Sequence, residues 1–147
     1  MKILMVCLGN ICRSPLAHGV MQALVSEKHL DWVVDSAGTG DWHVGQAPDR
    51  RAIAIAERFG VDISGQRAQH LRPEHLDVYD HILVMDHSNL RHVQDMARNK
   101  QQRERIALFL GDAEVPDPYY DDRLFEPVYR LVEARCKVLL HAWKSGH

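Results

Sequence analysis

The stretch KILMVCLGNICRSPLAHGV, residues 2–20, joins the three features that decide the fold. Lys2 to Val6 is a short apolar run, which is typical of a buried parallel strand. From Pro15 to about Lys28, apolar residues recur at helical spacing. Pro15 suits the first turn of such a helix, where its missing N–H costs nothing. A strand, a tight loop and a helix in succession predict the first part of a parallel β–α unit.

The same pattern repeats along the chain. Further strands are predicted at Asp31–Ser36, Tyr79–Met85 and Arg105–Leu110, and further helices at Pro48–Phe59, from an N-cap at Ser88 to about Arg98, and at Leu124–Lys144. Strands that alternate with helices indicate a parallel sheet covered on both faces. We therefore expect an α/β fold: a three-layer sandwich with a central four-stranded parallel sheet and helices on both faces, in a single domain that spans residues 1–147.

Composition narrows the function classes. The 147 residues carry a net charge of −2 with no basic stripe, so we expect neither a nucleic acid nor a membrane as partner. The first apolar run ends at Gly9, too early for a signal peptide or membrane span. Three widely spaced cysteines argue against a disulfide framework and suit a cytoplasmic protein. Their spacing is also poor for zinc, and we expect no metal and no cofactor.

The residues of the loop from Cys7 to Ser14 favour an anion-binding site. A helix N-terminus presents unpaired N–H groups and a partial positive charge. Gly9 allows a tight turn that directs further N–H groups inward. Arg13 adds a planar fork of donors that matches phosphate oxygens. The residue pattern therefore predicts that this loop binds a phosphate dianion.

Cys7 lies at the floor of that predicted site. A thiol beside a helix N-terminus and an arginine ionises readily, and a thiolate beneath a phosphate is an in-line nucleophile. Ser14 is placed to hydrogen-bond the sulfur and to make it a better leaving group. The loop amides and Arg13 then stabilise charge on the transferring phosphoryl group.

A phosphoryl transfer also needs an acid for the leaving oxygen. Asp117, in the sequence DPYY, is the best candidate because it lies in a loop after the last predicted strand, at the carboxyl edge of the sheet. Tyr119 and Tyr120 follow it and would form aromatic walls. An aromatic wall above an anion-binding floor suits an aryl phosphate such as phosphotyrosine.

Together, VCLGNICRSP and DPYY resemble the motifs of the low-molecular-weight protein-tyrosine phosphatases. The resemblance covers nearly the whole chain and includes DSAGTGDWHVGQAPD at 35–49 and YDHILVMDHSNL at 79–90. It implies that Cys7 is the nucleophile and forms a phosphocysteine, and that Arg13 clamps the phosphate. It also implies that Asp117 protonates the leaving tyrosine and then activates water.

The resemblance implies further roles by position. The phosphate-binding loop comprises Leu8, Gly9, Asn10, Ile11, Cys12 and Arg13. Asn10, Ser14 and Ser36 form a supporting network, and Trp42, Tyr119 and Tyr120 line the rim. Cys12 is a candidate redox partner for an oxidised Cys7. The expected partners are phosphotyrosine-containing proteins or peptides, with inorganic phosphate as product, and the chain is expected to be a monomer or to self-associate weakly.

The chain departs from the family pattern at two places. Many eukaryotic members carry a histidine in the supporting network where this chain, counted back from Asp86, has Gln66. His43 stands where an asparagine is frequent, which is expected to alter the charge of the rim at low pH.

Most of these residues also suit a purely structural role. Cys12 suits a purely structural role as well as a redox role, and Cys136 lies in the apolar stripe of the last helix. Asp86 is equally suited to supporting the loop and to capping a helix. Asp121 and Asp122 are expected to be charges at the start of the final helix.

Three alternative functions remain in view. An arsenate reductase on this fold needs further thiols after the third strand, and Met85 to Asn99 contains none. A non-catalytic phosphotyrosine-binding module would be expected to lack the nucleophile or the acid. A general aryl phosphatase is hardly separated from a protein phosphatase by sequence.

Overall fold

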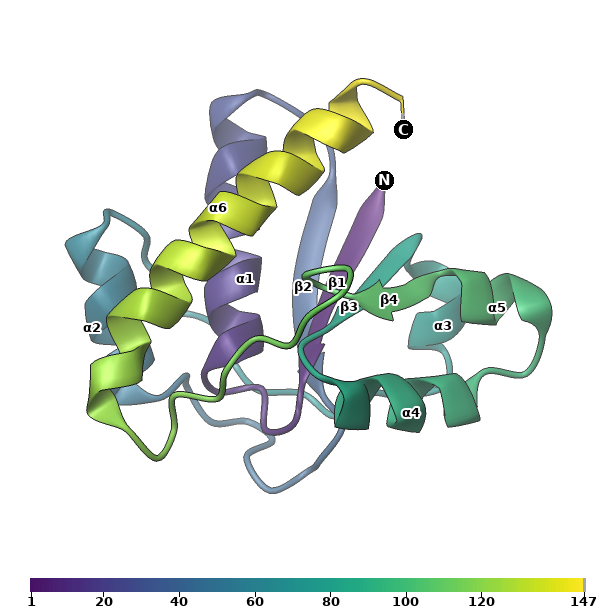
Figure 1. Ribbon diagram of the computed structural model, residues 1–147, viewed down its shortest axis with the longest axis horizontal. Coiled ribbons are helices and arrows are strands. Elements are labelled where there is room, and N and C mark those ends of the chain that lie inside the picture. Colours follow the sequence, from purple (N-terminus) through teal and green to yellow (C-terminus); the bar gives the residue numbers. More distant parts are fainter. Residues whose placement is uncertain (147) are drawn as a thin grey trace.

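Four parallel strands form the centre of the computed structural model, which describes residues 1–146 (Figure 1). The strands are β1 (Lys2–Cys7), β2 (Val33–Gly38), β3 (His81–Val84) and β4 (Ile106–Leu108), in the order β2-β1-β3-β4. β1 pairs with β2 from Lys2↔Val33 to Cys7↔Gly38, and with β3 from Ile3↔His81 to Val6↔Val84. The expected four-stranded parallel sheet is confirmed.

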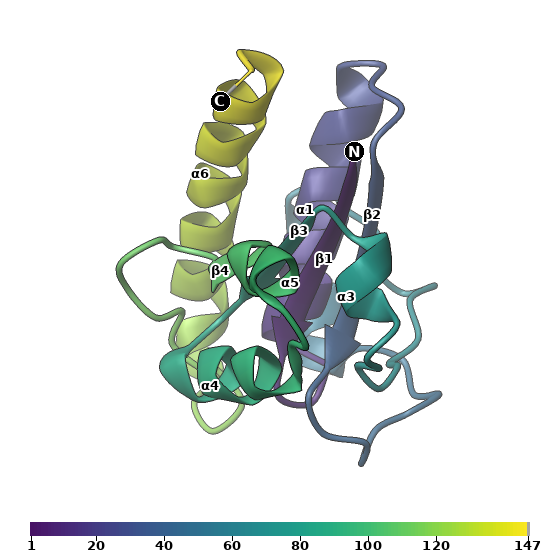
Figure 2. The same ribbon diagram turned by 90° about the vertical axis from the view of Figure 1, so that its right-hand side faces the viewer.

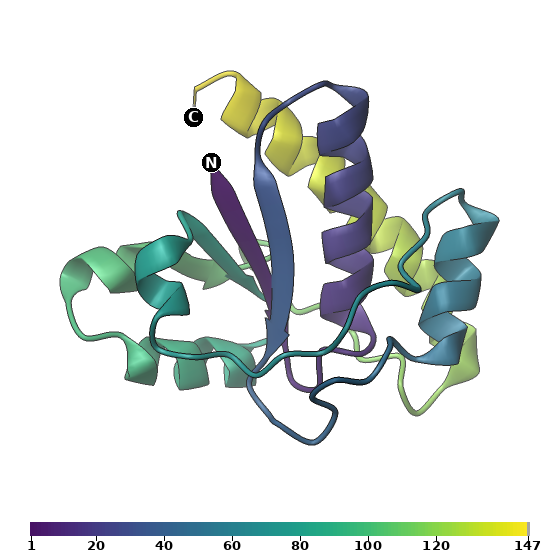
Figure 3. The same cartoon turned by 180° about the vertical axis from the view of Figure 1, so that it is seen from behind.

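Helices cover both faces of this sheet. The helices are α1 (Arg13–Glu27), α2 (Arg50–Arg58), α3 (His75–Val78), α4 (His87–Met96), α5 (Lys100–Glu104), the 3₁₀ turn η1 (Asp122–Leu124) and α6 (Phe125–Lys144). Figures 1 and 3 show α1, α2 and α6 on one side of the sheet, and Figure 2 looks onto the other side, which α3, α4 and α5 cover. The three-layer α/β architecture is confirmed.

Strand β1 is buried on both faces, and its alternation divides the core. Ile3 and Met5 pack into the cluster under α1, α2 and α6, whereas Leu4 and Val6 pack into the cluster under α3 and α4. Because successive side chains of a strand point to opposite faces, Cys7 follows Ile3 and Met5 onto the α1 face. The strand thus delivers its terminal sulfur to the space beneath the N-terminus of α1.

The two strands that follow β1 in the chain lie on opposite sides of it in the sheet. From β1 the chain crosses to β2 on one side, and later it returns to β3 on the other side. Such a switch point opens a crevice at the carboxyl ends of the strands. The segments after β1, β2 and β3 all begin at this edge.

Several sequence-based boundaries need correction. Asp86, and not Ser88, caps α4, because its carboxylate accepts a hydrogen bond from the Asn89 N–H at 2.8 Å. The short helices α3 and α5 were not predicted, because four or five residues are too few to show a helical period. β2 runs from Val33 to Gly38 instead of Asp31 to Ser36, since its length follows the pairing with β1. Within residues 1–146, no helix is long and apolar enough to cross a membrane.

Three histidines make stability depend on pH: His18, His75 and His81, whose pKa values are all lowered by burial below the usual 6.5. The unfolded chain therefore binds more protons at acid pH than the folded chain does. The free energy of unfolding that these histidines contribute is fully present above pH 6.5 and is lost as the pH falls below that value. We expect the urea concentration at the midpoint of unfolding to decrease when the pH is lowered from about 7.5 to about 5.5.

His81 stacks on Trp143, with ring centroids 4.4 Å apart, so His81→Phe preserves the stacking and removes one titrating ring. This variant should lose less stability over the same pH interval. An equal loss in both proteins would exclude His81 as a source of the pH dependence.

Candidate active site

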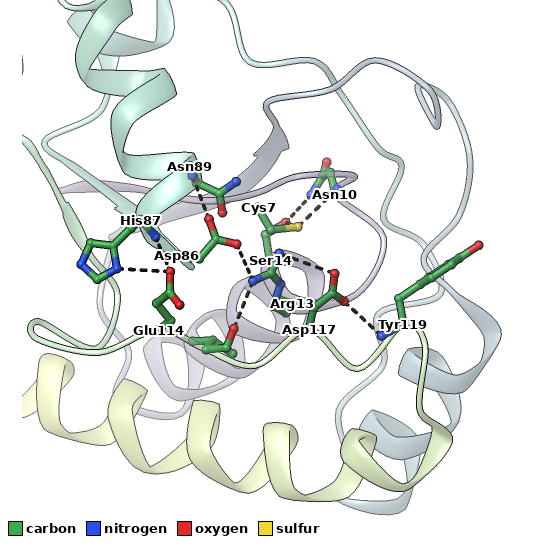
Figure 4. Close-up of polar contacts among 11 residues, drawn as sticks. Cys7, Asn10, Arg13, Ser14, Asp86, His87, Asn89, Glu114, Asp117 and Tyr119 are labelled. Carbon is green, nitrogen blue, oxygen red and sulfur yellow. Dashed lines mark hydrogen bonds and ion pairs between the residues drawn. The ribbon is translucent and has the colours of Figure 1, made fainter.

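Cys7 forms the floor of the site at the end of β1. Its side chain is buried, and two donors face its sulfur (Figure 4). The Ser14 hydroxyl lies 2.9 Å from Sγ, and the Asn10 N–H donates to Sγ at 3.3 Å. The sulfur at the floor therefore has two hydrogen-bonding partners, both from the loop that follows β1 and the first turn of α1.

The loop between β1 and α1 is anchored from outside through its carbonyl groups. The carbonyls of Cys7, Leu8 and Ile11 accept hydrogen bonds from the N–H groups of Thr39, Gly40 and Asp49, at 2.9, 2.9 and 2.8 Å respectively. Carbonyl groups that point outward leave the N–H groups of the loop turned toward its centre. The first-turn N–H groups of α1 have no partners within the helix itself, so the interior of the loop is rich in donors.

Asn10 holds the loop in a left-handed turn, with φ at 57°. Its side-chain amide donates to Ser14 Oγ at 2.8 Å, and its side-chain carbonyl accepts from the Gln69 N–H at 3.0 Å. Because Ser14 Oγ accepts from Asn10, its own proton is free to point at Cys7 Sγ. Asn10 thereby orients the serine hydroxyl as a donor to the sulfur.

Ser36 and Gln66 have other hydrogen-bond partners than expected. Among the described residues, the Ser36 hydroxyl pairs with His18 Nδ1 at 3.1 Å and makes no hydrogen bond to Asn10 or Ser14. Ser36 reaches the loop only indirectly, through its carbonyl, which accepts from the Gln69 side chain at 2.9 Å. Gln66 donates to the Pro15 carbonyl at 3.1 Å, and its buried Oε1 has no partner within residues 1–146.

Arg13 lies beside the sulfur in the first turn of α1 and is only 4% exposed. Its Nη1 donates to Asp86 Oδ2 at 2.9 Å and to the Val115 carbonyl at 3.0 Å. Its Nη2 lies 3.9 Å from Asp117 Oδ2. Figure 4 shows the guanidinium between Asp86 and Asp117, which come from different loops. Asp86 therefore supports Arg13 and also caps α4.

Asp117 stands at the mouth of the site. Its side chain is 40% exposed, and its Oδ1 accepts the Tyr119 N–H at 3.0 Å. This turn aims the other oxygen toward Arg13 and directs the Tyr119 ring outward (Figure 4). The carboxylate is thus fixed at one oxygen and open to solvent or ligand at the other.

A cavity of about 280 Å³ joins floor and mouth. Its lining unites the predicted nucleophile, clamp, acid and rim with most of the loop: Cys7, Leu8, Gly9, Ile11, Cys12, Arg13, Trp42, His43, Asp117, Tyr119 and Tyr120. The Trp42 ring occupies the space that a Cβ at Gly40 would take, so that glycine is required for the rim. His43 packs over Gly9, and its Nδ1 pairs with Gln46 Oε1 at 3.0 Å.

The other two cysteines differ from Cys7. Burial, with a smaller effect of Asp49, raises the pKa of Cys12, so this thiol stays protonated. Burial likewise raises the pKa of Cys136, whose sulfur lies 3.8 Å from the Ala17 carbonyl in the core. The redox role of Cys12 stays a prediction. Among residues 1–146, no group of three or more His, Cys, Asp or Glu side chains is placed to hold a metal ion.

Sequence reasoning missed Gln69 and Val115 as parts of the site. Both act mainly through backbone groups, which every residue possesses, so no side-chain pattern could reveal them. Asp86 was found only as an alternative, although its position directly after a strand was a usable signal.

Comparison with known proteins agrees with this geometry. The family model for low molecular weight phosphotyrosine protein phosphatases matches residues 2–146. The chain belongs to this family. It is 38% identical to the low molecular weight protein-tyrosine-phosphatase YfkJ of Bacillus subtilis, over 95% of this chain and 93% of that protein.

Solved structures of similar proteins have the same fold. A protein tyrosine phosphatase from Entamoeba histolytica superposes with a TM-score of 0.93 and 32% identity, covering 99% of this chain and 98% of that one. A Drosophila arginine phosphatase superposes with a TM-score of 0.91 and 31% identity over 100% of both chains. The family is one of protein-tyrosine phosphatases, which places this chain among the phosphoric monoester hydrolases.

The Asn10 network can be tested with two substitutions. Asn10→Gly tolerates the positive φ and loses both side-chain hydrogen bonds, whereas Asn10→Ala also strains the backbone by about 1 kcal/mol. We expect both variants to hydrolyse p-nitrophenyl phosphate about tenfold more slowly or worse, and only Asn10→Ala to show the additional loss in urea unfolding. Full activity in Asn10→Gly would show that the side-chain amide is dispensable.

Proposed function

We propose that this chain hydrolyses phosphotyrosine in proteins, and aryl phosphates generally, through a phosphocysteine intermediate. The observation that carries the proposal is the shared cavity, in which Cys7 Sγ forms the floor, the Arg13 guanidinium one side and the Asp117 carboxylate the mouth. A phosphate seated among the loop N–H groups would lie directly above the sulfur.

In the first step the Cys7 thiolate attacks phosphorus. The bond from phosphorus to the tyrosine oxygen breaks, and Asp117 gives its proton to that oxygen. Arg13 and the loop N–H groups stabilise the charge on the remaining phosphate oxygens. The products of this step are free tyrosine and a phosphocysteine.

In the second step a water molecule attacks the phosphocysteine. Asp117, now ionised, accepts a proton from that water, and the sulfur–phosphorus bond breaks. Cys7 leaves as a thiolate that receives hydrogen bonds from Ser14 and Asn10. Inorganic phosphate is released, and Asp117 is protonated again for the next cycle.

The walls of the cavity favour an aryl substrate. Cys7 is 3% exposed, so a phosphate must reach down past Trp42 and Tyr119. A tyrosine ring is long enough to span that depth and can stack on aromatic walls, whereas the short side chain of phosphoserine is not.

Phosphoarginine is a second candidate, because one similar structure is an arginine phosphatase. A guanidinium carries several N–H donors that need acceptors. Asp117 is the only carboxylate that lines the cavity within residues 1–146, and Leu8 and Ile11 are apolar. These features favour phosphotyrosine.

Three peptides that differ only in the phosphorylated residue test the substrate class. We expect kcat/KM for the phosphotyrosine peptide to exceed that for the phosphoserine and phosphoarginine peptides by about tenfold or more. Cys7→Ser should abolish turnover of all three while largely preserving phosphate binding. Equal rates on phosphotyrosine and phosphoserine would refute the tyrosine assignment, and full turnover by Cys7→Ser would refute the nucleophile.

Asp117→Asn tests the acid. The amide cannot donate the proton, so we expect kcat for phenyl phosphate to fall about a hundredfold or more. The loss should be smaller for p-nitrophenyl phosphate, whose leaving oxygen needs less help. Steady-state rates with both substrates measure this difference, and an equal loss with both would argue against proton donation by Asp117.

A further inference from the structure

Arg51 lies outside the catalytic cavity, in the first turn of α2, and makes a dense set of contacts. The Asp49 carboxylate accepts hydrogen bonds from the Arg51 backbone N–H at 2.8 Å, from Nε at 3.0 Å and from Nη2 at 2.9 Å. Nη1 reaches Asp122 Oδ1 at 2.6 Å. The guanidinium is therefore fixed by carboxylates on two sides, one from the N-cap of α2 and one from η1.

Two aromatic rings hold the flat face of the same guanidinium. Its central carbon lies 5.4 Å from the centroid of the Tyr119 ring and 4.7 Å from that of Phe125. Phe125 is buried at the start of α6, whereas Tyr119 is 40% exposed at the rim. The guanidinium thus connects an exposed rim side chain to the packed start of a helix.

These contacts lead to both halves of the site. On one side, the Asp49 N–H donates to the carbonyl of Ile11 in the phosphate-binding loop at 2.8 Å. On the other side, the Tyr119 N–H donates to Asp117 Oδ1 at 3.0 Å. Arg51 is therefore connected to the phosphate-binding loop through Asp49 and to Asp117 through Tyr119.

We propose that Arg51 is a positioning residue for the reaction, which holds the Tyr119 wall and the Asp117 turn at their working distance from the phosphate-binding loop. This inference rests on the proposed function, since it concerns the acid and the wall that the function uses. Hydrogen bonds from Arg51 keep the pKa of Asp49 below its usual 3.8, so the link persists at neutral pH.

Arg58 offers a matched comparison on the same helix. Arg58 also joins α2 to α6, through an ion pair of 2.9 Å with Glu126, and it lies over the Phe59 ring at 6.0 Å. Like Arg51, Arg58 does not line the catalytic cavity, but within residues 1–146 it makes no ion pair with Asp49 and no cation–π contact with Tyr119. A purely structural role for Arg51 predicts similar effects of the two arginines, whereas a positioning role predicts that only Arg51 affects the acid step.

The experiment compares Arg51→Gln with Arg58→Gln. For Arg51→Gln we expect kcat/KM for phenyl phosphate to fall about tenfold, because a cation–π contact and a fixed acid are lost together. The fall for p-nitrophenyl phosphate should be smaller, and the inhibition constant of inorganic phosphate should change by less than about twofold. Arg58→Gln should leave all three values near those of the wild type, and urea unfolding monitors the stability of both variants.

Three results would overturn the proposal. The first is an equal loss of kcat/KM in the two variants. The second is a loss in Arg51→Gln that is the same for both aryl phosphates. The third is weaker inhibition by phosphate, which would mean that the floor itself had been distorted.

If Arg51→Gln does not fold, Asp122→Asn decides, because Asp122 is 81% exposed and its substitution is tolerable for folding. Its kcat/KM for phenyl phosphate should fall about threefold, and an unchanged value would overturn the proposal. Wild-type protein that is inactive on both aryl phosphates would instead refute the proposed function, and this inference with it. Equal behaviour of Arg51→Gln and Arg58→Gln in an active enzyme counts against this inference alone.

Discussion

The buried guanidinium of Arg13 is the constraint on which the geometry of the site depends. A charge that is 4% exposed is costly unless it is paired and hydrogen-bonded. Here Asp86 and the Val115 carbonyl satisfy one nitrogen, and Asp117 approaches the other. These partners come from the segments after β3 and β4. Pairing the arginine therefore draws three loops together at one edge of the sheet.

The same residues serve the fold and the site at once. Asp86 caps α4 with one oxygen and pairs with Arg13 through the other. Asn10 closes a left-handed turn and orients Ser14 toward the sulfur. Because each side chain has two partners, a change in the loop is felt in the helix beside it. This sharing joins the loop, α1 and α4 in one hydrogen-bonded network.

The sequence predicts the parallel sheet and its covering helices because apolar runs and helical spacing are local patterns. Cys7, Arg13 and Asp117 are predicted as well, because Cys7 ends β1, Arg13 lies in the first turn of α1 and Asp117 lies in the loop after β4, all at the carboxyl edge of the sheet. Gln69 could not be predicted, since its contribution to Asn10 is a backbone N–H whose position depends on the whole fold. Ser36 was expected to support the loop through its hydroxyl. Its position beside the loop fits that role, but the hydroxyl pairs with His18 on α1 instead.

Exposure is low at the floor of the cavity and high at its rim, and this difference suits the two steps of the proposed reaction. Cys7 is 3% exposed, the Asp117 side chain 40% and Tyr120 88%. A dry floor would strengthen the interactions of Arg13 with a bound phosphate in the proposed reaction, because charges attract more in a low dielectric. An exposed mouth gives Asp117 access to the water that the second step of the proposed mechanism consumes. In the proposed mechanism Asp117 therefore stands where the leaving group departs and water enters, so that one carboxylate can serve both steps.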